Sequence, residues 1–374
     1  MAEPIRILHC FGRTDIGGAE TMVMNIYRNI DRDKVQFDFV IHTKDNCAYD
    51  NEIISLGGSV YHVPRYKIFN HFTYLKAWDK IFKKYKDRWV ILHAHVLTTA
   101  GFYLRVAKKN GIITIAHSHT NYWGNILSKA KIISRYLLKN NSDYLFACSE
   151  PAGFWLFGKK EAFVIIKNAI DLSKFVFDQN KRNKKRNEFQ IEDKFVLGHI
   201  GNFIYYKNHD FIIEIFKAVY DKNEQAILML VGDGNLRHDI EKKVHDLGLT
   251  DKVIFAGVRS DVPDLLQAMD VFIFPSLHEG LGLVTIEAQA TGLHCIVADT
   301  IPKEAYVTEL IEAESLKAPA NQWAENILKY ANGYLRIGKT ELIKTKGYDI
   351  VETAKWLENF YLKEHEKLFS TKHN

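Results

Sequence analysis

Two glutamates, Glu279 and Glu287, lie in a glycine-containing segment, residues 278–288, with the sequence HEGLGLVTIEA. Gly280 and Gly282 carry no Cβ atom, so the backbone at these positions can approach a ligand closely. Ionised carboxylates accept hydrogen bonds from hydroxyl groups such as those of a sugar or a ribose. The segment therefore predicts a loop and helix that present one carboxylate to a sugar and the other to a ribose.

The elements around these glutamates also predict an anion site. An apolar strand, Val271–Phe274, precedes the loop, and a helix over residues 283–291 follows it and ends at Gly292. The first N–H groups of a helix have no intrahelical acceptor, and they lie at the positive end of the helix dipole. A phosphate group is the expected partner for such a turn.

A histidine pair marks the end of another predicted strand. Residues 112–117 form an apolar run that ends in His117, and His119 follows. Histidine is the side chain whose charge changes near neutral pH, which suits it to acid–base chemistry. A histidine at a strand end is also common as a purely structural residue, so the residues alone leave both interpretations open.

Three further patterns have ordinary structural explanations. The pair Gly17-Gly18 follows the first apolar run and by itself predicts a tight turn. Lys207 alone is typical of a solvated surface. The triplet at residues 31–33, Asp-Arg-Asp, has the spacing of a metal-binding pair, but it follows a predicted helix and lies away from the glycine turn. We interpret it as a surface turn and expect no metal site.

Short apolar runs alternate with helix-like segments along the chain, which predicts βα units and parallel sheets covered on both faces. The polar stretch 178–193 interrupts this rhythm, and we interpret it as a surface linker; nucleic-acid binding by residues 181–186 is the alternative. The alternation then restarts and ends in an amphipathic helix over residues 349–369. Two doubly wound domains would leave a cleft at the carboxyl ends of their strands, where ligands bind in such sheets.

The composition is that of a globular protein, with 47% hydrophobic and 25% charged residues in 374. No run approaches the length of a membrane span, and no signal-peptide pattern is present, so we expect a cytoplasmic protein. The four cysteines are far apart and form no metal-binding or disulfide pattern. Residues 1–180 contain 25 Lys and Arg against 16 Asp and Glu, which indicates an anionic partner or an ordinary solvated surface.

The segment 278–288 resembles the E-x7-E motif of family 4 of the retaining glycosyltransferases, which have the GT-B fold. The resemblance covers nearly the whole chain, because other short motifs of that family follow in the expected order. They are residues 17–20, 147–150, 168–171, 200–208, 232–234 and 257–259. Residues 287–292 look closest to members that build capsular and exopolysaccharides. Each motif is weak alone, and their order and spacing make the resemblance specific.

The resemblance implies a role for each matching residue. Glu287 would bind the ribose, Glu279 the transferred sugar, and Lys207 the leaving diphosphate. His117, with His119 as the second choice, would lie beside the sugar and the acceptor. The other implied substrate contacts are Gly17, Gly18, Asn202, Val258, Arg259, Gly280, Leu281, Gly282, Leu283 and Val284.

One position departs from the family pattern. The family commonly has an arginine where this chain has Asn202, so one positive charge on the diphosphate is missing or is supplied by Arg13 or Arg259. The implied fold is α/β, with two Rossmann-like domains facing a central cleft. An acceptor-binding domain would span residues 1–180 and be completed by a helix at about 350–374, and a nucleotide-sugar domain would span residues 190–349.

The implied activity is transfer of a hexose or N-acetylhexosamine from a nucleotide diphosphate sugar to a glycan or polyprenyl-linked glycan. The family implies retention of configuration, and the base-binding turn suits a UDP-sugar; no cofactor is expected. A nucleotide-sugar 2-epimerase of the same architecture is the main alternative. A nicotinamide-dependent oxidoreductase is disfavoured because the first turn lacks G-x-G-x-x-G. A catalytically silent binding protein is disfavoured by the presence of Glu279, Glu287 and Lys207.

Two segments rich in basic and aromatic residues, 74–89 and 126–138, predict amphipathic helices. Such helices can lie on an anionic bilayer. Crossover helices that pack on a parallel sheet have the same periodicity, so both interpretations stay open. The polyprenyl-linked acceptors of the family make peripheral docking on the inner face of the cell membrane a sensible hypothesis, and no nucleic-acid partner is expected.

Overall fold

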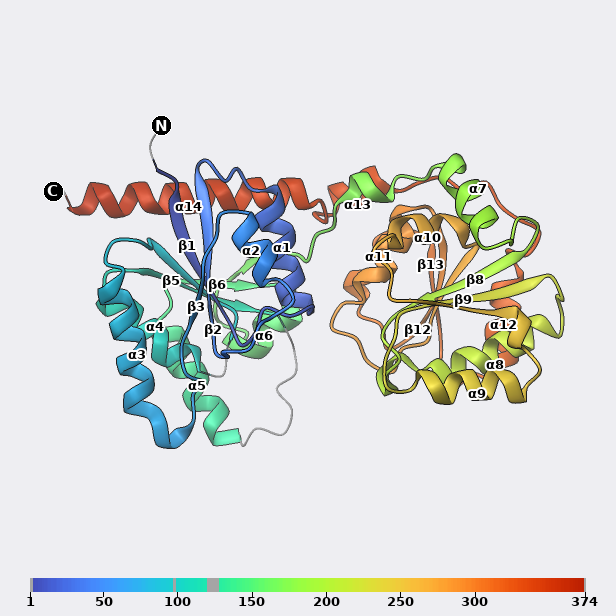
Figure 1. Cartoon of the computed structure of the whole chain (residues 1–374), viewed down its shortest axis with the longest axis horizontal. Coiled ribbons are helices and arrows are strands. Elements are labelled where there is room, and N and C mark those ends of the chain that lie inside the picture. The colour runs from blue at the N-terminus through green and yellow to red at the C-terminus, as the bar shows by residue number, and fades with distance from the viewer. Residues whose placement is uncertain (1–2, 97–98, 120–127, 373–374) are drawn as a thin grey trace. The chain divides into compact units, whose positions relative to one another are not determined.

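The computed structural model describes residues 3–96, 99–119 and 128–372, and the chain divides into two compact units. The first consists of Met1–Ile170 and Gly347–Asn374, and the second of Asp171–Lys346. Each unit is a parallel β-sheet with helices on both faces (Figure 1). The predicted α/β class with two doubly wound sheets is therefore confirmed.

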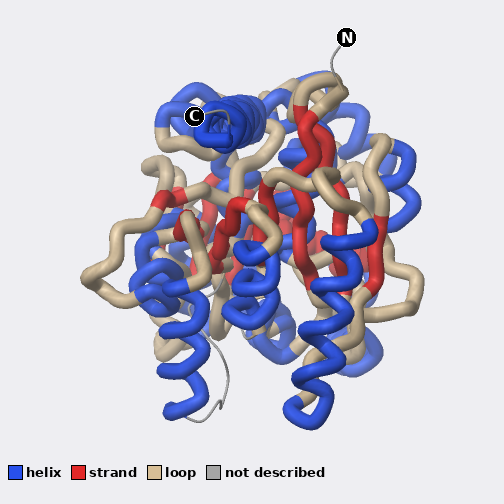
Figure 2. The backbone as a smooth tube through the Cα atoms, turned by 90° about the vertical axis from the view of Figure 1, so that its left-hand side faces the viewer, coloured by secondary structure: helices blue, strands red, loops and turns tan. Residues whose placement is uncertain are grey.

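The sheet of the first unit has seven described strands in the order β3-β2-β1-β4-β5-β6-β7, all parallel. Figure 2 shows strands of this unit in red with helices on either side. In sheet order the strands are β3 (Val60–His62), β2 (Val35–Ile41), β1 (Ile5–Phe11), β4 (Ile91–Ala94), β5 (Ile113–Ser118), β6 (Tyr144–Ala147) and β7 (Val164–Ile165).

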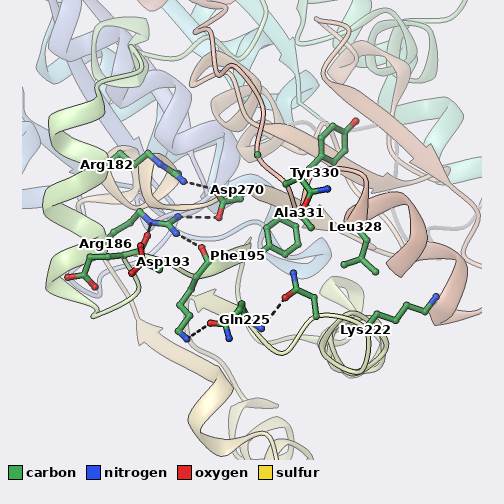
Figure 3. Close-up of a pocket in the computed structure, with 15 residues that line it drawn as sticks. Arg182, Arg186, Asp193, Phe195, Lys222, Gln225, Asp270, Leu328, Tyr330 and Ala331 are labelled. Atoms are coloured by element: carbon green, nitrogen blue, oxygen red, sulfur yellow. Dashed lines mark hydrogen bonds and ion pairs between the residues drawn. The ribbon is translucent and has the colours of Figure 1, made fainter.

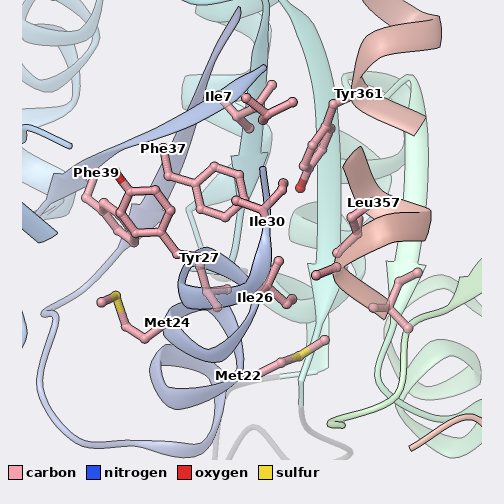
Figure 4. Close-up of a cluster of buried hydrophobic side chains, with 14 of the residues drawn as sticks. Ile7, Met22, Met24, Ile26, Tyr27, Ile30, Phe37, Phe39, Leu357 and Tyr361 are labelled. Atoms are coloured by element: carbon pink, nitrogen blue, oxygen red, sulfur yellow. The ribbon is translucent and has the colours of Figure 1, made fainter. Parts of the chain in front are cut away.

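Alternate residues of these strands supply two separate cores, as the period of a strand requires. On one face, Ile7 and Phe37 pack with Tyr27 of α1 (Gly18–Asn29) and with Leu357 and Tyr361 of α14 (Ile350–Lys372), as Figure 4 shows. The opposite face packs against α3 (His71–Lys84) and α4 (Ala100–Lys109). The first unit also contains α2 (Asp50–Ser55), α5 (Ser128–Asn140) and α6 (Glu150–Phe157).

The amphipathic helix predicted at 349–369 is α14, and it completes the first unit. A parallel bridge between Ile170 and Asp349 places the segment that leaves this unit beside the segment that returns to it. Helix α14 contacts α1, β1 and β2. Residues separated by more than 300 positions in the sequence thus share one core.

The sheet of the second unit has six described strands in the order β10-β9-β8-β11-β12-β13. Helix α8 packs with α9 and α12, and α11 packs with α13. The strands are β10 (Val253–Gly257), β9 (Ala226–Val231), β8 (Phe195–Ile200), β11 (Val271–Phe274), β12 (His294–Ala298) and β13 (Ile311–Glu314). The helices are α7 (Gln179–Glu188), α8 (His209–Tyr220), α9 (Arg237–Asp246), α10 (Val262–Ala268), α11 (Leu283–Ala290), α12 (Ala320–Leu328) and α13 (Thr340–Thr345).

The prediction of a surface linker at residues 178–193 is wrong, because most of this stretch is helix α7 of the second unit. Asp178 caps the helix by accepting from the backbone N–H of Asn180 at 2.7 Å. Arg182 donates to the carbonyl oxygens of residues 267 and 269, each at 2.9 Å. Arg186 donates to the carbonyl of residue 268 at 2.8 Å. The helix docks through guanidinium groups rather than apolar side chains, so it lacks the hydrophobic periodicity of a packed helix.

No helix in the described part of the chain combines the length and apolar character that crossing a bilayer requires.

Candidate functional site

Loops at the carboxyl ends of neighbouring strands form one side of the second unit. The loop after β8 hydrogen-bonds to the turn after β9, since Phe203 N donates to Asp233 O at 2.9 Å. The turn after β9 is joined to the end of β10 by Gly232 N and Gly257 O at 2.8 Å. The loop after β11 is joined to the loop after β8 by Leu277 N and Tyr206 O, also at 2.8 Å. The predicted motifs of this unit are thus adjacent in space.

Glycine is required at Gly232 and Gly234 because the loop after β8 passes directly against them. A Cβ atom on Gly232 would lie 2.2 Å from the carbonyl oxygen of Gly201, and one on Gly234 would lie 2.6 Å from that of Phe203. Both glycines also have positive φ. The turn at residues 232–234 therefore shapes the loop that carries Asn202, whose side chain is exposed.

Lys207 and Glu279 form an ion pair, with 2.6 Å between Lys207 Nζ and Glu279 Oε1. Both side chains are largely buried, with 19% and 12% of their surface exposed. The ammonium group also lies 4.6 Å from the centre of the Phe274 ring. The lysine is delivered by the 3₁₀ turn Tyr205–Lys207, and the left-handed residue Asn208, at φ +58°, leads from that turn into α8. The structure thus brings together the two residues predicted to contact the diphosphate and the sugar.

Helix α11 begins at Leu283, directly after Gly282. Gly282 has φ +76°, a backbone conformation that glycine adopts without strain, and its carbonyl accepts from the Thr285 hydroxyl at 2.7 Å. The first turn of α11 presents backbone N–H groups without intrahelical acceptors at the carboxyl end of the sheet. Leu281, Leu283 and Val284 are half-buried, and Gly280 is exposed.

Glu287 lies farther along α11 and is partly buried. Burial raises the pKa of its carboxyl group from 4.5 to about 7. No residue in the described ranges forms a hydrogen bond or ion pair with this carboxylate. A partly buried acid without a partner among the described residues, at the same end of the sheet as the Lys207–Glu279 pair, is a candidate ligand contact.

The two arginines considered as replacements for the missing cation already have carboxylate partners. Arg259 pairs with Asp261 at 2.7 Å and with Glu188 at 3.2 Å. In the first unit, Arg13 pairs with Asp15 at 2.5 Å and with Asp45 at 2.7 Å. A phosphate would have to compete with these carboxylates. Val258, in the turn predicted to bind the base, is 79% exposed.

The glycine turn of the first unit precedes α1. Gly17 is the N-cap of this helix, and a Cβ atom there would lie 2.5 Å from a carboxylate oxygen of Glu20. Gly18 has open space around it. Burial raises the pKa of the Glu20 carboxyl group.

The predicted residues His117 and His119 belong to a larger group, which we call the histidine cluster: His9, His93, His95, His117 and His119. All five occupy alternate positions of β1, β4 and β5 or the residues just after these strands, and so share the face covered by α14. The pairs His9 Nδ1–His95 Nε2, His95 Nδ1–His119 Nε2 and His93 Nε2–His117 Nδ1 are 3.0, 2.7 and 3.1 Å apart.

Burial lowers the pKa of His9 and His119 to about 3 and that of His93, His95 and His117 well below the usual range. The cluster is therefore neutral at pH 7. His117 is only 1% exposed, whereas His119 is partly exposed. Sequence reasoning missed His9, His93 and His95, although the H-x-H spacing at 93–95 and 117–119 was a signal that these side chains share one face.

A cavity of about 750 Å³ in the second unit does not include any predicted site residue. It lies at the amino ends of β8 and β11, and Figure 3 shows Arg182 and Arg186 there in contact with Asp270. Ligands of doubly wound sheets bind at the opposite, carboxyl ends. Both arginines of α7 in this cavity are already paired with Asp270, so we assign the cavity to the packing of α7.

A second cavity of about 720 Å³ lies at the carboxyl ends of β1, β2 and β4 in the first unit. Arg13, His42, Arg65, Tyr66 and Thr99 are among the residues that line it. The Arg65 guanidinium forms no ion pair with any described residue. Burial, together with the charge of Arg65, lowers the pKa of His42 to about 4. This cavity has the position and polarity of a binding site for an anionic or hydroxyl-rich ligand.

The triplet at residues 31–33 forms a surface turn, in which Asp31 pairs with Lys34 at 2.6 Å.

Comparison with known proteins gives matches to both halves of the chain. Residues 16–174 match the family model described as Glycosyltransferase Family 4, and residues 180–336 match that of Glycosyl transferases group 1. The putative glycosyltransferase EpsF of Bacillus subtilis (strain 168) is 34% identical over 371 residues, which cover 95% of this chain and 96% of that protein.

Two further relatives have more specific names. The capsular polysaccharide biosynthesis glycosyltransferase CapH of Staphylococcus aureus is 24% identical over 379 residues, covering 96% of this chain and 99% of CapH. The UDP-Gal:alpha-D-GlcNAc-diphosphoundecaprenol alpha-1,3-galactosyltransferase of Escherichia coli is 28% identical over 233 residues, covering 57% and 59% of the two chains.

Among solved structures, Anabaena Alr3699/HepE in complex with UDP is similar to this chain with a TM-score of 0.78. The alignment covers 96% of this chain and 100% of that one at 18% sequence identity. At this level of sequence identity, the structural similarity supports the fold alone. The predicted GT-B architecture is confirmed.

Proposed function

This chain belongs to family 4 of the glycosyltransferases and has the GT-B fold, and from that premise we propose that it transfers a hexose or N-acetylhexosamine from a UDP-sugar to a lipid-linked glycan with retention of configuration. The observation that carries the proposal is the buried Lys207–Glu279 pair beside the start of α11. The name of the E. coli relative supports a UDP-sugar donor and a diphosphoundecaprenol-linked acceptor. The name of CapH supports a place in surface polysaccharide biosynthesis.

The second unit supplies the groups that would bind the donor. Glu287 would accept hydrogen bonds from the ribose, and backbone N–H groups of the first turn of α11 would bind the diphosphate. Lys207 would stabilise the negative charge that develops on the leaving phosphate. Its partner Glu279 holds the ammonium group in place and would contact the transferred sugar.

Retention would follow from attack on the same face that the diphosphate leaves. The acceptor oxygen bonds to the anomeric carbon as the bond to the phosphate oxygen breaks, and the acceptor proton passes to that phosphate oxygen. The transition state resembles an oxocarbenium ion, so the largest demand on the protein is charge stabilisation at the leaving group. The acceptor would bind in the first unit, where the 720 Å³ cavity and the partly exposed His119 lie at the carboxyl ends of the strands.

Mass spectrometry tests this function directly. The purified protein is incubated with a panel of UDP-sugars and lipid-linked glycan acceptors, and the expected product is an acceptor heavier by one sugar together with free UDP. NMR of the new anomeric proton reports whether configuration is retained. Conversion of the UDP-sugar to an isomer without any acceptor would show an epimerase instead, an alternative that the relatives' names do not favour.

Transfer is expected to continue in excess EDTA. Helix N–H groups and Lys207 are the charge-stabilising groups of the proposed donor site, and neither needs a metal. The measurement is the initial rate with and without EDTA at constant ionic strength. A rate that falls to background in EDTA and returns with Mg²⁺ or Mn²⁺ would contradict this expectation and direct attention back to residues 31–33.

We also propose that the first unit docks on an anionic membrane through an exposed apolar tip, defined as Ile68, Phe69 and Phe72. These side chains are 88%, 86% and 78% exposed, at the start of α3. The apolar face of α3 itself, with Tyr74, Trp78 and Phe82, packs on the sheet. The exposed Lys67 adjoins the tip in the chain, and further exposed lysines lie along and just after α3: Lys76, Lys80, Lys83, Lys84 and Lys86. Apolar side chains flanked by cations fit the interface of an anionic bilayer.

Liposome sedimentation is expected to show binding that requires anionic lipid and weakens with salt, since each cation near the surface contributes about 1 kcal/mol. Replacing the three residues of the tip with serine should release the protein into the supernatant. Leu335→Ser is the matched control, because Leu335 is 85% exposed in the second unit. Wild-type protein that stays in the supernatant at low salt would exclude membrane docking. The second basic segment, 126–138, includes residues 126 and 127, which lie outside the described residues.

A further inference from the structure

Three members of the histidine cluster could share one ligand. His95, His117 and His119 each offer a ring nitrogen, and these atoms lie within 4.8 Å of one another. His117 belongs to β5, while His95 and His119 directly follow β4 and β5. These strands are adjacent and paired, so the sheet itself fixes the spacing of the three imidazoles.

The remaining nitrogens of two of these imidazoles have partners that set their orientation. His117 Nδ1 lies 3.1 Å from His93 Nε2, and His93 Nδ1 lies 2.8 Å from the hydroxyl of Tyr361. His95 Nε2 lies 3.0 Å from His9 Nδ1. Histidines that bind a metal usually have the second ring nitrogen hydrogen-bonded, because that contact fixes the tautomer and the ring plane. The cluster thus has an inner layer of three imidazoles and an outer layer that orients them.

One ring nitrogen of the inner layer, His117 Nε2, has no hydrogen-bond partner among the described residues, although it is buried. Buried polar atoms are nearly always satisfied in folded proteins. Since the other nitrogen of His117 is held by His93, its Nε2 is the atom available to a ligand. An unsatisfied, neutral imidazole nitrogen is an electron-pair donor, and the ligand it suits is an electron-pair acceptor.

We propose that His95, His117 and His119 bind one divalent transition-metal ion of the zinc class. Imidazole nitrogen suits Zn²⁺, Co²⁺, Ni²⁺ and Cu²⁺, whereas Mg²⁺ and Ca²⁺ require oxygen ligands that these three residues lack. Three histidines leave a fourth position for water or an anion. Two nitrogens at a tetrahedral zinc are about 3.3 Å apart. His95 Nδ1 and His119 Nε2, now 2.7 Å apart, would therefore separate slightly as the ion replaces the proton between them.

A metal ion bound to these histidines would inhibit sugar transfer, a consequence that rests on the proposed function. The acceptor is proposed to bind at the carboxyl ends of the strands of the first unit, where the partly exposed His119 lies, and a bound ion would occupy one of the ring nitrogens of His119. The three histidines belong to the first unit and the residues proposed to bind the donor diphosphate to the second, so transfer without added metal is still expected. Stoichiometric Zn²⁺ should therefore lower the rate of transfer, and EDTA should restore it.

Calorimetric titration of the metal-free protein with Zn²⁺, together with elemental analysis, tests the site without any substrate. One tight equivalent is expected for the wild type and none for His117→Gln or His119→Gln. His62→Gln is the control, because His62 is an exposed histidine of the same unit whose ring binds the Thr43 carbonyl. Wild-type protein that binds no more Zn²⁺ than the His119→Gln variant would overturn the proposal.

A second variant keeps the test valid if the histidine variants fail to fold. Tyr361→Phe removes the outermost orienting hydroxyl and should weaken Zn²⁺ binding by about 10- to 100-fold without changing the stoichiometry. Tyr27→Phe is the matched control, since its buried hydroxyl bonds to Gln36 in the same core but does not touch the cluster. Equal Zn²⁺ affinity in both tyrosine variants would count against the outer layer and overturn the proposed geometry. Tight Zn²⁺ binding with an unchanged transfer rate would leave the metal site standing and contradict the proposed inhibition of transfer.

Discussion

Lys207→Ala is expected to lower kcat for sugar transfer by about 100- to 1,000-fold, the usual cost of removing one preorganised group that stabilises developing charge. The ammonium group is largely buried, is held 2.6 Å from Glu279 and lies over the Phe274 ring, so it has little freedom to reorganise. Negative charge on the diphosphate grows as the glycosidic bond breaks, and the lysine therefore matters more in the transition state than in the ground state. The Kd for UDP should change much less than kcat. Steady-state kinetics and calorimetry with UDP give the two quantities.

The same substitution also leaves Glu279 buried without its cation, which destabilises the fold. The double variant Lys207→Met, Glu279→Gln removes both charges and separates the two effects. Its Tm should return toward that of the wild type, whereas its kcat should stay low. Lys243→Ala is the matched control, because Lys243 forms ion pairs with Asp210 and Glu214 on the surface of the same unit. A Lys207→Ala enzyme with full kcat would exclude a role at the leaving group.

Glu287→Ala is expected to weaken UDP binding by at least about tenfold. A hydrogen bond to a charged acceptor is worth about 1.5–3 kcal/mol, and the proposed contact with the ribose supplies two. Calorimetric titration with UDP measures the change, and Glu224→Ala, an exposed glutamate of the same unit, is the control. Unchanged affinity would remove Glu287 from the ribose site.

The pKa of Glu287 adds a pH signature to this prediction. The carboxyl group has a pKa of about 7 in the folded protein, and only its ionised form accepts both hydrogen bonds. UDP affinity should therefore rise between pH 6 and pH 8 in the wild type and should lose this component in Glu287→Gln. A pH profile that is the same in both proteins would contradict the assignment.

Whereas UDP affinity should rise with pH, the ionisation of Glu287 should lower the stability of the folded protein as pH rises. The folded-state pKa of Glu287 is raised, so its carboxyl group costs nothing below pH 4.5 and destabilises the fold progressively as pH rises from 4.5 through about 7. Glu287→Gln removes this cost. At pH 8 the Tm of the variant should exceed that of the wild type, by about 2–4 °C for each 1 kcal/mol of stability gained. Near pH 4.5 the two Tm values should be similar. Thermal unfolding at the two pH values tests the sign.

The alternation of apolar runs was sufficient to predict two parallel sheets, because strands buried on both faces have to be continuous apolar segments. It was not sufficient for α7. That helix is held by Arg182 and Arg186, which bind backbone carbonyls, and a guanidinium contact leaves no periodic trace in the sequence. The resemblance to a family placed Lys207 and Glu279 in one site, but their ion pair depends on how two separate loops meet, which no local pattern encodes.

Local sequence patterns also failed to predict the exposed apolar tip and the complete histidine cluster. Residues 74–89 had the periodicity of a membrane helix, and their apolar side chains pack on the sheet. The exposed residues are Ile68, Phe69 and Phe72, which precede the periodic stretch and form no regular pattern. The histidine cluster depends on the pairing of β1, β4 and β5, so its five side chains could not be brought together from spacing within a single strand.

Because α14 completes the first unit, this unit cannot finish folding until the end of the chain has been synthesised. Residues up to Ile170 leave the ribosome first, but the cover of the face that carries Ile7 and Phe37 is completed by Leu357 and Tyr361 of α14. The second unit, Asp171–Lys346, is synthesised in full before that covering segment appears. The unit made first is thus the one that finishes folding last, and its open hydrophobic face makes the nascent chain a natural client for ribosome-bound chaperones during that interval.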